Sequence, residues 1–468
     1  MSEEKIKKNI YRTIIFFFAL FLVLIAHITY LQIFEAAQLA NHPLNHRVIG
    51  SNQERGRIID NHGNTLAESK RTADGTFDRY YPQGALFCHV TGYASTKFGR
   101  TGIESYYNAD LAGLNDPWQK LGPIAHLLGH ARGNDIRLTI NSDVQKVAAA
   151  ALGGRKGAIV VLAPKTGAVI AMVSNPVFDP NKLEENWDSL STNSESPLLN
   201  RAVQGLYPPG SVFKTLIADA AIKEKIADTS SSYNCPGYIN LNDNYTIYES
   251  HRAIHGKVDL EDALAVSCNV TFAKLTLQLG EKRLSEAFSR FGFDKELTGE
   301  FANGKPPLPE FKKLHDGDLA QIGIGQGTLL VSPLRMALLA SAFANNGVIM
   351  KPQLVDAVLT SSGIVLQKYQ PEKWLEATSP DRASLLQQFM KTAVSDGTAT
   401  RASVAGIDVT GKTGTAENSA GETHAWFIGS ATIKNKVYSF AVIIENGGGG
   451  GSDAAPIVRK IITESLMN

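Results

Sequence analysis

The sequence predicts an α+β fold in which helices cover one antiparallel sheet, placed behind a smaller β-rich segment and an apolar N-terminal helix. Two apolar strands are expected early in the larger part, at 158–162 and 168–173, and strands return near its end at 425–428 and 438–444. Helical patterns fill most of the sequence between them. Strands at both ends with helices between predict a single sheet closed by the first and last parts of the domain.

Length and composition fit a folded protein of two domains. The chain has 468 residues, more than the usual size of a single core, and 43% of them are apolar against 19% charged. The formal net charge of +1 gives no reason to propose a nucleic acid as a partner. The cysteines, Cys88, Cys235 and Cys268, are odd in number and widely spaced, so they predict neither a disulfide framework nor a zinc site. One disulfide can form among them, and its pairing is left open.

The N-terminus predicts a membrane anchor. Residues 1–12 are rich in Lys and Arg, and the run 13–34 that follows is uncharged. At 1.5 Å per residue this run is about 33 Å long as a helix, enough to cross a bilayer core. A cleaved signal peptide would have a shorter apolar region and a small-residue exit, whereas this run ends in large residues. We expect an uncleaved signal anchor, with 1–12 as a cytoplasmic tail and everything after Phe34 outside.

A pedestal or docking domain is expected over 35–135. Residues 55–67 predict a strand, a tight turn and a second strand, and residues 102–113 predict a short helix that a glycine stops. This part of the sequence shows no nucleophile motif and no metal-ligand spacing.

The second domain is expected over 136–468. Ser142-Asp143 is the predicted N-cap of a helix that runs through Leu152. Pro164–Gly167 joins the first two apolar strands as a hairpin turn. Helices are expected to dominate 212–280 and 333–344.

The C-terminal end predicts a last helix against the sheet. It follows the glycine run 447–451, with Ser452 or Asp453 as its cap. An apolar face from Ile457 to Leu466 would pack on the domain.

A nucleophile paired with a base is predicted at Ser211-Val212-Phe213-Lys214. Pro and Gly end the loop before Ser211, and an apolar helical run follows it, so Ser211 should lie in the first turn of a buried helix. The spacing of three places Lys214 on the same face, near the Ser211 hydroxyl. A lysine among apolar neighbours is desolvated, which favours its neutral, basic form. Ser2-Glu3-Glu4-Lys5 has the same spacing and none of this context.

A polar pair, Ser267 and Asn269, is predicted inside an apolar helix. Polar residues in such surroundings need hydrogen-bond partners. The other Ser-x-Asn copies, 191–193 and 232–234, lie in polar sequence typical of turns.

A carboxylate-binding strand is predicted at Lys412-Thr413-Gly414. Glycines on both sides allow a bound ligand to approach the backbone closely. The Lys412 ammonium and the hydroxyls of Thr413 and Thr415 suit a carboxylate. Lys165-Thr166-Gly167 repeats the tripeptide between two strands and is assigned to the hairpin turn.

Two further patterns are interpreted as structural. Gly323–Gly327 lacks the strand context and the Lys-Ser/Thr of a phosphate loop, so a close-packed active-site loop is expected. His251 and His255 are four apart with no metalloprotease glutamate between them, and no metal site or other cofactor is predicted.

The ordered motifs resemble those of class B penicillin-binding proteins, the monofunctional transpeptidases of peptidoglycan synthesis. The resemblance covers almost the whole chain and is greatest to the shorter members. It implies a transpeptidase/β-lactamase-like fold. Relatives often carry a second cysteine soon after one in a Cys-Pro-Gly such as 235–237. The next cysteine here is Cys268, so the resemblance does not support a disulfide at that place.

The resemblance also implies residue roles. Ser211, activated by Lys214, would form an acyl-enzyme with the stem peptide, and β-lactams would acylate the same serine. Ser267 would relay the proton and Asn269 would bond the donor amide. The resemblance adds Gly414 to the substrate-binding set, with Thr413 and Thr415. Backbone N–H groups of Ser211 and Thr415 would form the oxyanion hole.

Expected partners are peptidoglycan stem peptides, their lipid-linked precursor, β-lactams and a membrane glycan polymerase. The resemblance places the enzyme in cell-wall synthesis, in cell shape or in cell division. Two other activities stay open: a D,D-carboxypeptidase or β-lactamase that uses water as acceptor, and a membrane β-lactam sensor. A sensor would have several spans and a cytoplasmic effector, whereas the sequence predicts one span and a short tail.

Overall fold

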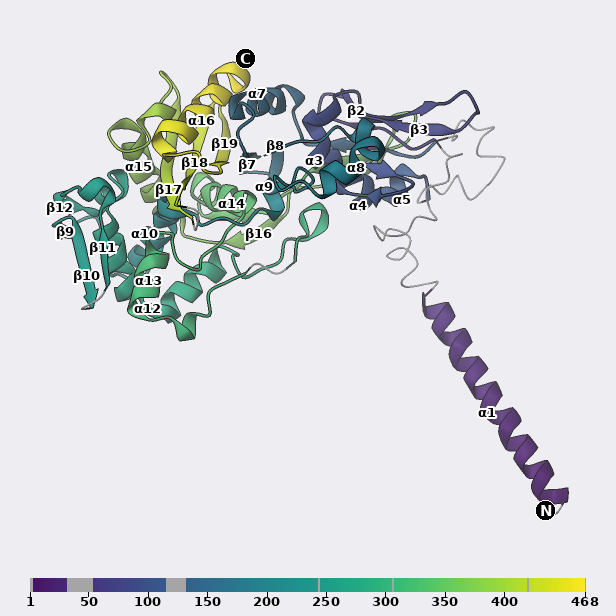
Figure 1. The fold of residues 1–468 in the computed structure, drawn as a ribbon. Coiled ribbons are helices and arrows are strands. Elements are labelled where there is room, and N and C mark those ends of the chain that lie inside the picture. The colour runs from purple at the N-terminus through teal and green to yellow at the C-terminus, as the bar shows by residue number, and fades with distance from the viewer. Residues whose placement is uncertain are drawn as a thin grey trace.

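A computed structural model describes residues 3–31, 54–114, 132–242, 245–304, 307–418 and 421–467. The described chain forms a large helix-covered part around one sheet, and a second sheet at the end where β2 and β3 lie (Figure 1). The small strands β9 to β12 lie at the opposite end of the same view.

The central sheet has five antiparallel strands in the order β17-β18-β19-β7-β8. β19 pairs with β7, Ile443 opposite Ala158, so the end of the chain closes the sheet against its beginning, as the sequence predicts. The Pro164–Gly167 turn joins β7 to β8, which confirms the predicted hairpin. The strands are β7 Gly157–Ala163, β8 Ala168–Asn175, β17 Asp408–Glu417, β18 Thr423–Ile433 and β19 Lys436–Ile444.

Helices cover both faces of this sheet. Ala158 and Val160 of β7 belong to one buried core with α14 (Pro333–Ala344), whereas Ile159 and Val161 belong to a second core with α7 (Ser142–Leu152) and α16 (Ala455–Ile461). Because successive side chains of a strand point to opposite faces, a continuous apolar run is what a sheet buried on both sides requires.

Two predicted helix caps are wrong in detail. The N-cap of α7 is Asn141, whose Oδ1 accepts the N–H groups of Asp143 and Val144, because Ser142 already has helical backbone. At the C-terminus a wide π-helical turn, Gly450–Ala454, leads into α16, so Ser452 and Asp453 lie inside the helical segment and not before it.

The stretch 212–280 is less helical than predicted. Helices α10 (Lys214–Lys223), α11 (Leu260–Ala265) and α12 (Asn269–Arg290) are present, but two small sheets lie between α10 and α11. Each of these strands has only four or five residues, so the alternation that β9 and β12 show is too short to predict a strand from sequence. They are β9 Ser232–Cys235, β10 Tyr238–Asn242, β11 Tyr245–Tyr248 and β12 Gly256–Asp259.

The second sheet combines N-terminal and distant strands in the order β15-β14-β6-β1-β2-β3. The strand–turn–strand predicted at 55–67 is confirmed as β1 and β2, which are antiparallel. The predicted short helix is present as two pieces, α4 Gly102–Tyr106 and α5 Asn108–Leu111. The strands are β1 Ile58–Ile59, β2 Thr65–Arg71, β3 Phe77–Tyr80, β6 Asp135–Leu138, β14 Val355–Leu359 and β15 Val365–Lys368.

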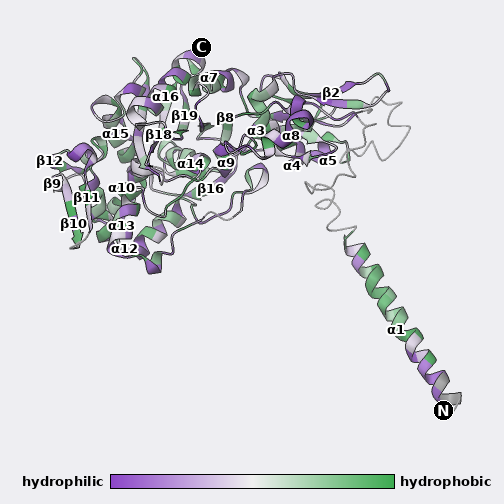
Figure 2. Ribbon diagram, in the orientation of Figure 1, coloured by the Kyte–Doolittle hydropathy of each residue, from purple (hydrophilic) through white to green (hydrophobic). Residues whose placement is uncertain are grey.

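Helix α1 spans Glu3–Tyr30. Among the described residues, its segment Lys7–Tyr30 is the one helix long and apolar enough to cross a membrane, with a window of mean hydropathy 2.4. Figure 2 shows the hydrophobic colour along most of this helix. Residues 32–34, the end of the predicted span, lie outside the described residues.

Candidate active site

The turn that carries Ser211 is held against strands β17 and β18. Ser211 lies in a 3₁₀ turn, Gly210–Phe213, and α10 begins directly after it at Lys214, so the predicted first helical turn is a tight 3₁₀ turn. Trp426 of β18 donates Nε1–H to the carbonyl oxygen of Pro208 at 2.9 Å. Gly210 has a φ of 59°, and a Cβ there would lie 2.7 Å from the carbonyl oxygen of Thr415. Glycine at this position therefore lets the Ser211 turn approach β17 closely.

The Gly323–Gly327 segment supports the same turn. Gly210 donates its N–H to the carbonyl oxygen of Gly325 at 2.8 Å, and Gly325 has a φ of 78°. A Cβ at Gly325 would lie 1.9 Å from the carbonyl oxygen of Gly210. The loop is therefore packed against the Ser211 turn, which confirms its interpretation as a close-packed loop.

The Lys214 side chain contacts Ser267 and Asn269, which lie far from it in sequence. Its fully buried Nζ donates to the carbonyl oxygen of Ser267 at 2.6 Å and to Oδ1 of Asn269 at 2.7 Å. Its third polar neighbour is the hydroxyl of Ser267, at 3.2 Å. Two carbonyl acceptors suit a neutral amine, whose lone pair remains for a hydroxyl proton. The arrangement can therefore pass a proton between Lys214 and Ser267.

The environment of Lys214 favours the neutral amine. Burial lowers the pKa of Lys214 to about 8, and the negative charge of Glu249 opposes part of this shift. A base that titrates near the pH at which it operates is effective in proton transfer. The structure thus agrees with the sequence argument for a desolvated lysine after Ser211.

The sequence analysis predicts that Ser267 and Asn269 lie inside one helix, and this prediction is wrong. The two residues lie at a junction between two helices. α11 ends at Ala265 and α12 begins at Asn269. Ser267 adopts a φ of 65°, a left-handed conformation that costs a non-glycine residue about 1 to 3 kcal/mol. Cys268 is the N-cap of α12, and its Sγ accepts the N–H of Thr271 at 3.4 Å. The strained turn aims the Ser267 carbonyl and hydroxyl at Lys214.

Glu249 is a residue of this site that the sequence analysis missed. Its two carboxylate oxygens accept the N–H groups of Val270 at 2.8 Å and Asn269 at 2.9 Å, at the start of α12. Burial opposes ionisation of Glu249, but these hydrogen bonds and the Cys268 thiol outweigh it and lower its pKa. The carboxylate thereby fixes the backbone on the C-terminal side of the Ser267 turn.

Lys412 lies on β17 and is fully buried. Its Nζ donates to the carbonyl oxygen of Thr413 at 2.9 Å. Burial, and then the positive charge of Lys214, lower the pKa of Lys412 well below its usual range. Two buried lysines that feel each other's charge resist being protonated together.

The residues around Lys412 differ in exposure. Thr413 is buried and donates its hydroxyl to Oγ1 of Thr398 at 2.6 Å, whereas Thr415 is exposed. A Cβ at Gly414 would lie 3.0 Å from the carbonyl oxygen of Pro209 and 3.1 Å from Cγ1 of Val212. Because side chains alternate along a strand, Lys412 and Gly414 share the face of β17 that meets the Ser211 turn.

The structure therefore brings the three predicted motifs to one place. Sequence order gives no signal for Glu249, for Thr398, or for Tyr248, whose carbonyl oxygen accepts Nδ2–H of Asn269 at 2.9 Å. These residues act through contacts between distant segments. The one feature of the sequence that hints at a further polar partner near this turn is Cys268, which lies between Ser267 and Asn269.

The chain matches two models of known protein families. Residues 157–463 match the family described as penicillin binding protein transpeptidase domain, and residues 55–130 match the penicillin binding protein A dimerisation domain. The peptidoglycan D,D-transpeptidase PbpA of Mycolicibacterium smegmatis is 32% identical, over 96% of this chain and 96% of its own. The peptidoglycan D,D-transpeptidase MrdA of Acinetobacter baumannii is 30% identical, over 83% of this chain and 66% of its own.

Solved structures show the same likeness. A D,D-transpeptidase domain from Eggerthella lenta superposes with a TM-score of 0.81 and 33% identity, covering 89% of this chain and 98% of that one. Penicillin-binding protein A of Mycobacterium tuberculosis, as its ceftriaxone acyl-enzyme, gives a TM-score of 0.82 at 28% identity, covering 89% of this chain and 99% of that one.

Proposed function

This chain belongs to the penicillin-binding protein transpeptidases, and from that premise we propose that Ser211 is the serine through which it works. The enzyme cross-links peptidoglycan stem peptides by D,D-transpeptidation and is acylated by β-lactams. The observation that carries the assignment of residues is the buried Nζ of Lys214, which follows Ser211 by one turn and contacts Ser267 and Asn269.

The first half-reaction acylates Ser211. Neutral Lys214 takes the Ser211 hydroxyl proton as Oγ attacks the carbonyl carbon between the two terminal D-alanines. Negative charge on the carbonyl oxygen is met by the N–H groups of Ser211 and Thr415. The proton passes from Lys214 through Ser267 to the nitrogen of the departing D-alanine, so the C–N bond breaks without leaving an unprotonated amide anion.

The second half-reaction transfers the acyl group. An amine of another stem peptide attacks the ester carbonyl and loses a proton along the same path in reverse. The proton returns to Ser211 Oγ, and the new amide is the cross-link. A β-lactam enters the first step and stays on Ser211 as an acyl-enzyme.

Substrate binding is assigned to β17 and to Asn269. The terminal carboxylate of the stem peptide is assigned to the hydroxyls of Thr413 and Thr415, and the Thr413 hydroxyl would turn from Thr398 to the carboxylate on binding. A bound anion favours the protonated form of Lys412 behind them, and Gly414 leaves room for the peptide backbone. Asn269 uses Oδ1 for Lys214 and one Nδ2–H for Tyr248. Its second Nδ2–H is assigned to the carbonyl oxygen of the donor amide.

The division of the chain follows the same proposal. Residues 1–12 form a cytoplasmic tail, 13–34 a single membrane span, 35–135 a pedestal and 136–468 the transpeptidase domain on the extracytoplasmic side. This places the reaction beside lipid-linked precursor in the cell membrane. A membrane glycan polymerase is the proposed partner, with the anchor and pedestal as its contact. The apolar helix Lys7–Tyr30 supports the anchor.

Labelling with a fluorescent penicillin tests the assignment of Ser211. The purified full-length chain should be labelled and Ser211→Ala should not, while Ser2→Ala, which alters the other Ser-x-x-Lys copy, should be labelled as fast as the wild type. Peptide mapping should find the adduct on Ser211. An adduct on another side chain, or equal labelling of Ser211→Ala, would contradict the assignment.

A second measurement separates transpeptidation from hydrolysis. With a lipid-linked substrate, the wild type should form cross-linked peptide dimer in step with released D-alanine. Release of D-alanine without dimer would contradict a transpeptidase and indicate a carboxypeptidase.

A further inference from the structure

An exposed arginine, Arg252, is connected to Asn269 through Tyr248, and the proposed mechanism gives it no role. Its short turn, Ser250–Arg252, begins one residue after the end of β11. Tyr248, the last residue of β11, accepts Nδ2–H of Asn269 at its carbonyl oxygen, at 2.9 Å. The ring of Tyr248 lies against the guanidinium of Arg252, with 3.4 Å between Cζ and the ring centroid. A single residue therefore links Arg252 to the side chain that is assigned to the donor amide.

The stacking on Tyr248 holds the guanidinium ready for a ligand. At 3.4 Å the planar group lies on the face of the ring, where cation–π attraction keeps it. The N–H groups lie in the plane of the guanidinium, so stacking leaves them available as donors. Tyr238 of β10 stands opposite Tyr248 in the hairpin, with 6.3 Å between the ring centroids, and supports the ring. Because the arginine has already lost much of its rotamer freedom, a ligand binds it at a smaller cost in conformational entropy.

The backbone of this turn places Arg252 at an energetic cost. His251 has a φ of 53° and Arg252 a φ of 55°, both in the left-handed region that residues with a Cβ rarely adopt. Arg252 donates its N–H to the carbonyl oxygen of Glu249 at 3.1 Å, which closes the turn. A turn with only a connecting role would suit glycine at these positions. Such strain next to a candidate site supports a function for the side chain that it positions.

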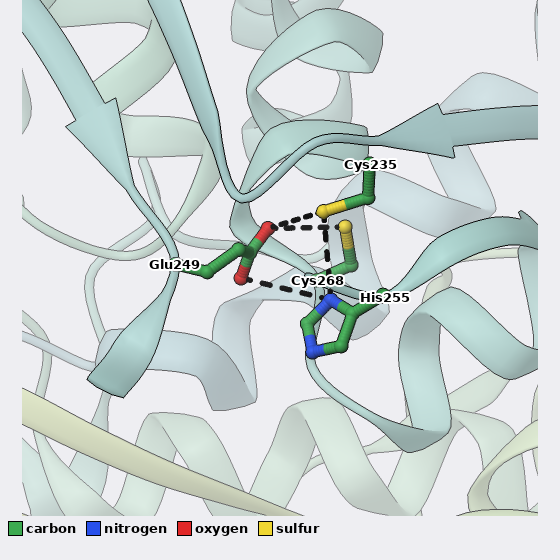
Figure 3. A group of neighbouring side chains, drawn as sticks. All are labelled: Cys235, Glu249, His255 and Cys268. Atoms are coloured by element: carbon green, nitrogen blue, oxygen red, sulfur yellow. Dashed lines mark hydrogen bonds and ion pairs between the residues drawn. The ribbon is translucent and has the colours of Figure 1, made fainter. Parts of the chain in front are cut away.

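Arg252 has no carboxylate partner within the protein: it forms no ion pair with any residue that the structure describes. Glu249 is the nearest acidic residue in sequence, but it is only 4% exposed. Figure 3 shows its carboxylate directed at Cys235, Cys268 and His255. Sγ of Cys268 lies 3.1 Å and Sγ of Cys235 lies 3.3 Å from Oε1 of Glu249. The charge of Arg252 is therefore available for a carboxylate that comes from outside the chain.

The assigned subsites fix the direction of the donor peptide. Its terminal carboxylate is assigned to β17, its reacting carbonyl to Ser211 and the carbonyl of its donor amide to Asn269. The peptide therefore leaves the site past Asn269, and the residue before the two D-alanines comes next to Tyr248 and Arg252. In peptidoglycan this residue is a diamino acid, whose side chain either ends in an amine alone or also carries a carboxylate. A free carboxylate at that place complements the charge of Arg252.

We propose that Arg252, stacked on Tyr248, binds the side-chain carboxylate of the residue that precedes the D-alanines in the donor stem peptide. Two parallel N–H groups of the guanidinium donate to the two carboxylate oxygens. No covalent bond changes in this contact. Arg252 is thus a specificity-determining residue, which favours donors with this carboxylate over donors without it. This role rests on the proposed function, because the direction of the peptide follows from it.

An exchange assay with two donors that differ in one group tests this role. The full-length chain, purified in detergent, receives a lipid-linked donor whose third stem residue has a free side-chain carboxylate, or the same donor with that carboxylate amidated. An excess of a D-amino acid serves as the acceptor in both assays. The wild type should show about tenfold higher kcat/KM with the free carboxylate, mainly through a lower KM, since the contact is made in the bound state as well as in the transition state.

Variants of the stacked pair should change this preference in a graded way. Arg252→Gln should use the two donors alike, because glutamine has no charge. Arg252→Lys should keep part of the preference, since the charge stays and the paired N–H geometry is lost. Tyr248→Phe, which keeps the ring, should preserve more of the preference than Tyr248→Leu. Arg459→Gln is the matched control: Arg459 is exposed on α16, on the face of the sheet opposite the Ser211 turn, and the variant should keep the whole preference.

Penicillin labelling separates this role from the proposed function. Penicillin has no counterpart of the residue before the D-alanines, so Arg252→Gln should lose much more in exchange of the carboxylate donor than in labelling. Equal losses in both, or the same donor preference in the wild type and in Arg252→Gln, would overturn the role of Arg252. A wild type that labels and exchanges without preferring the free carboxylate would overturn it too, and would leave the proposed function intact. A wild type that neither labels nor exchanges contradicts the proposed function itself.

Discussion

The tripeptide Lys-Thr-Gly occurs twice in this chain, in two very different surroundings. Lys165-Thr166-Gly167 forms the turn between β7 and β8, where Lys165 is exposed. Lys412-Thr413-Gly414 lies in the middle of β17, where Lys412 is fully buried and Gly414 meets the Ser211 turn. The same three residues thus end a hairpin in one place and line the candidate active site in the other.

The difference teaches that burial and neighbours, and not the residue types, set the chemistry of the motif. In the turn, Gly167 provides a φ of 77° and donates its N–H to the carbonyl oxygen of Ala163 at 2.8 Å. On β17 the glycine provides space for another segment. An exposed lysine is solvated and screened, whereas a buried one acts in a low dielectric, where its charge has a larger effect.

The largest expected effect separates the two lysines. Lys412→Ala should slow penicillin acylation by about 10²- to 10³-fold, the usual cost of removing one group that stabilises the transition state. Lys165→Ala should leave the acylation rate unchanged. Stopped-flow labelling of the two variants measures both rates. If both variants are acylated equally slowly, or if neither is slowed, the two Lys-Thr-Gly copies do not differ in function as proposed.

Sequence reasoning separates these copies because local context is enough to do so. The turn copy is flanked by two apolar strands after a proline, and the β17 copy is flanked by glycines. The same kind of context distinguishes Ser211 from the Ser-x-x-Lys copy at Ser2, since Pro and Gly precede Ser211 and an apolar helix follows it. The closure of the sheet by the first and last parts of the domain follows from the positions of the apolar strands at both ends.

What the sequence does not predict depends on contacts between distant segments. The Glu249 carboxylate accepts hydrogen bonds from the N–H groups of Asn269 and Val270, which are distant in sequence. The residues beside Glu249 in the sequence give no sign of these hydrogen bonds. Ser267 is assigned to a helix because apolar residues flank it on both sides, yet tertiary contacts hold it at a junction with a φ of 65°. The strands β9 to β12 are missed because each has only four or five residues, too few for an alternating pattern to be decisive.

The second prediction is a change of about tenfold in the acylation rate with pH. It tests the distinction between the buried and the exposed lysines. Burial lowers the pKa of Lys214 to about 8. In the proposed mechanism the neutral amine of Lys214 is the base. As pH rises through this value, Lys214 loses its proton, so acylation should speed up by about tenfold between pH 7 and pH 9. The rate constant of labelling against pH gives the inflection. Lys165→Ala should show the same profile, and a rate that falls over this range would contradict Lys214 as the base.

The smallest expected effect on acylation comes from replacing the glycines of the two copies, Gly167 and Gly414. One substitution should mainly lower stability, and the other should mainly slow acylation. In Gly167→Ala the new Cβ would lie 2.1 Å from the carbonyl oxygen of Lys351 at a positive φ, so the variant should lose about 1 to 3 kcal/mol of stability. Its acylation rate at low temperature should stay near that of the wild type, because the turn is not part of the candidate site.

In Gly414→Ala the new Cβ would meet Pro209 at 3.0 Å and Val212 at 3.1 Å, contacts that a shift of a few tenths of an ångström relieves. That shift moves the Ser211 turn, so acylation should slow by about three- to tenfold, since small errors of position lower the rate of reaction. Its melting temperature should change less than that of Gly167→Ala. Thermal unfolding and labelling of both variants measure the pair. The contrary result is a Gly414→Ala variant that loses stability and keeps its acylation rate. The glycine of β17 would then have the same structural role as the glycine of the hairpin. The two Lys-Thr-Gly copies would not differ in the way that their surroundings indicate.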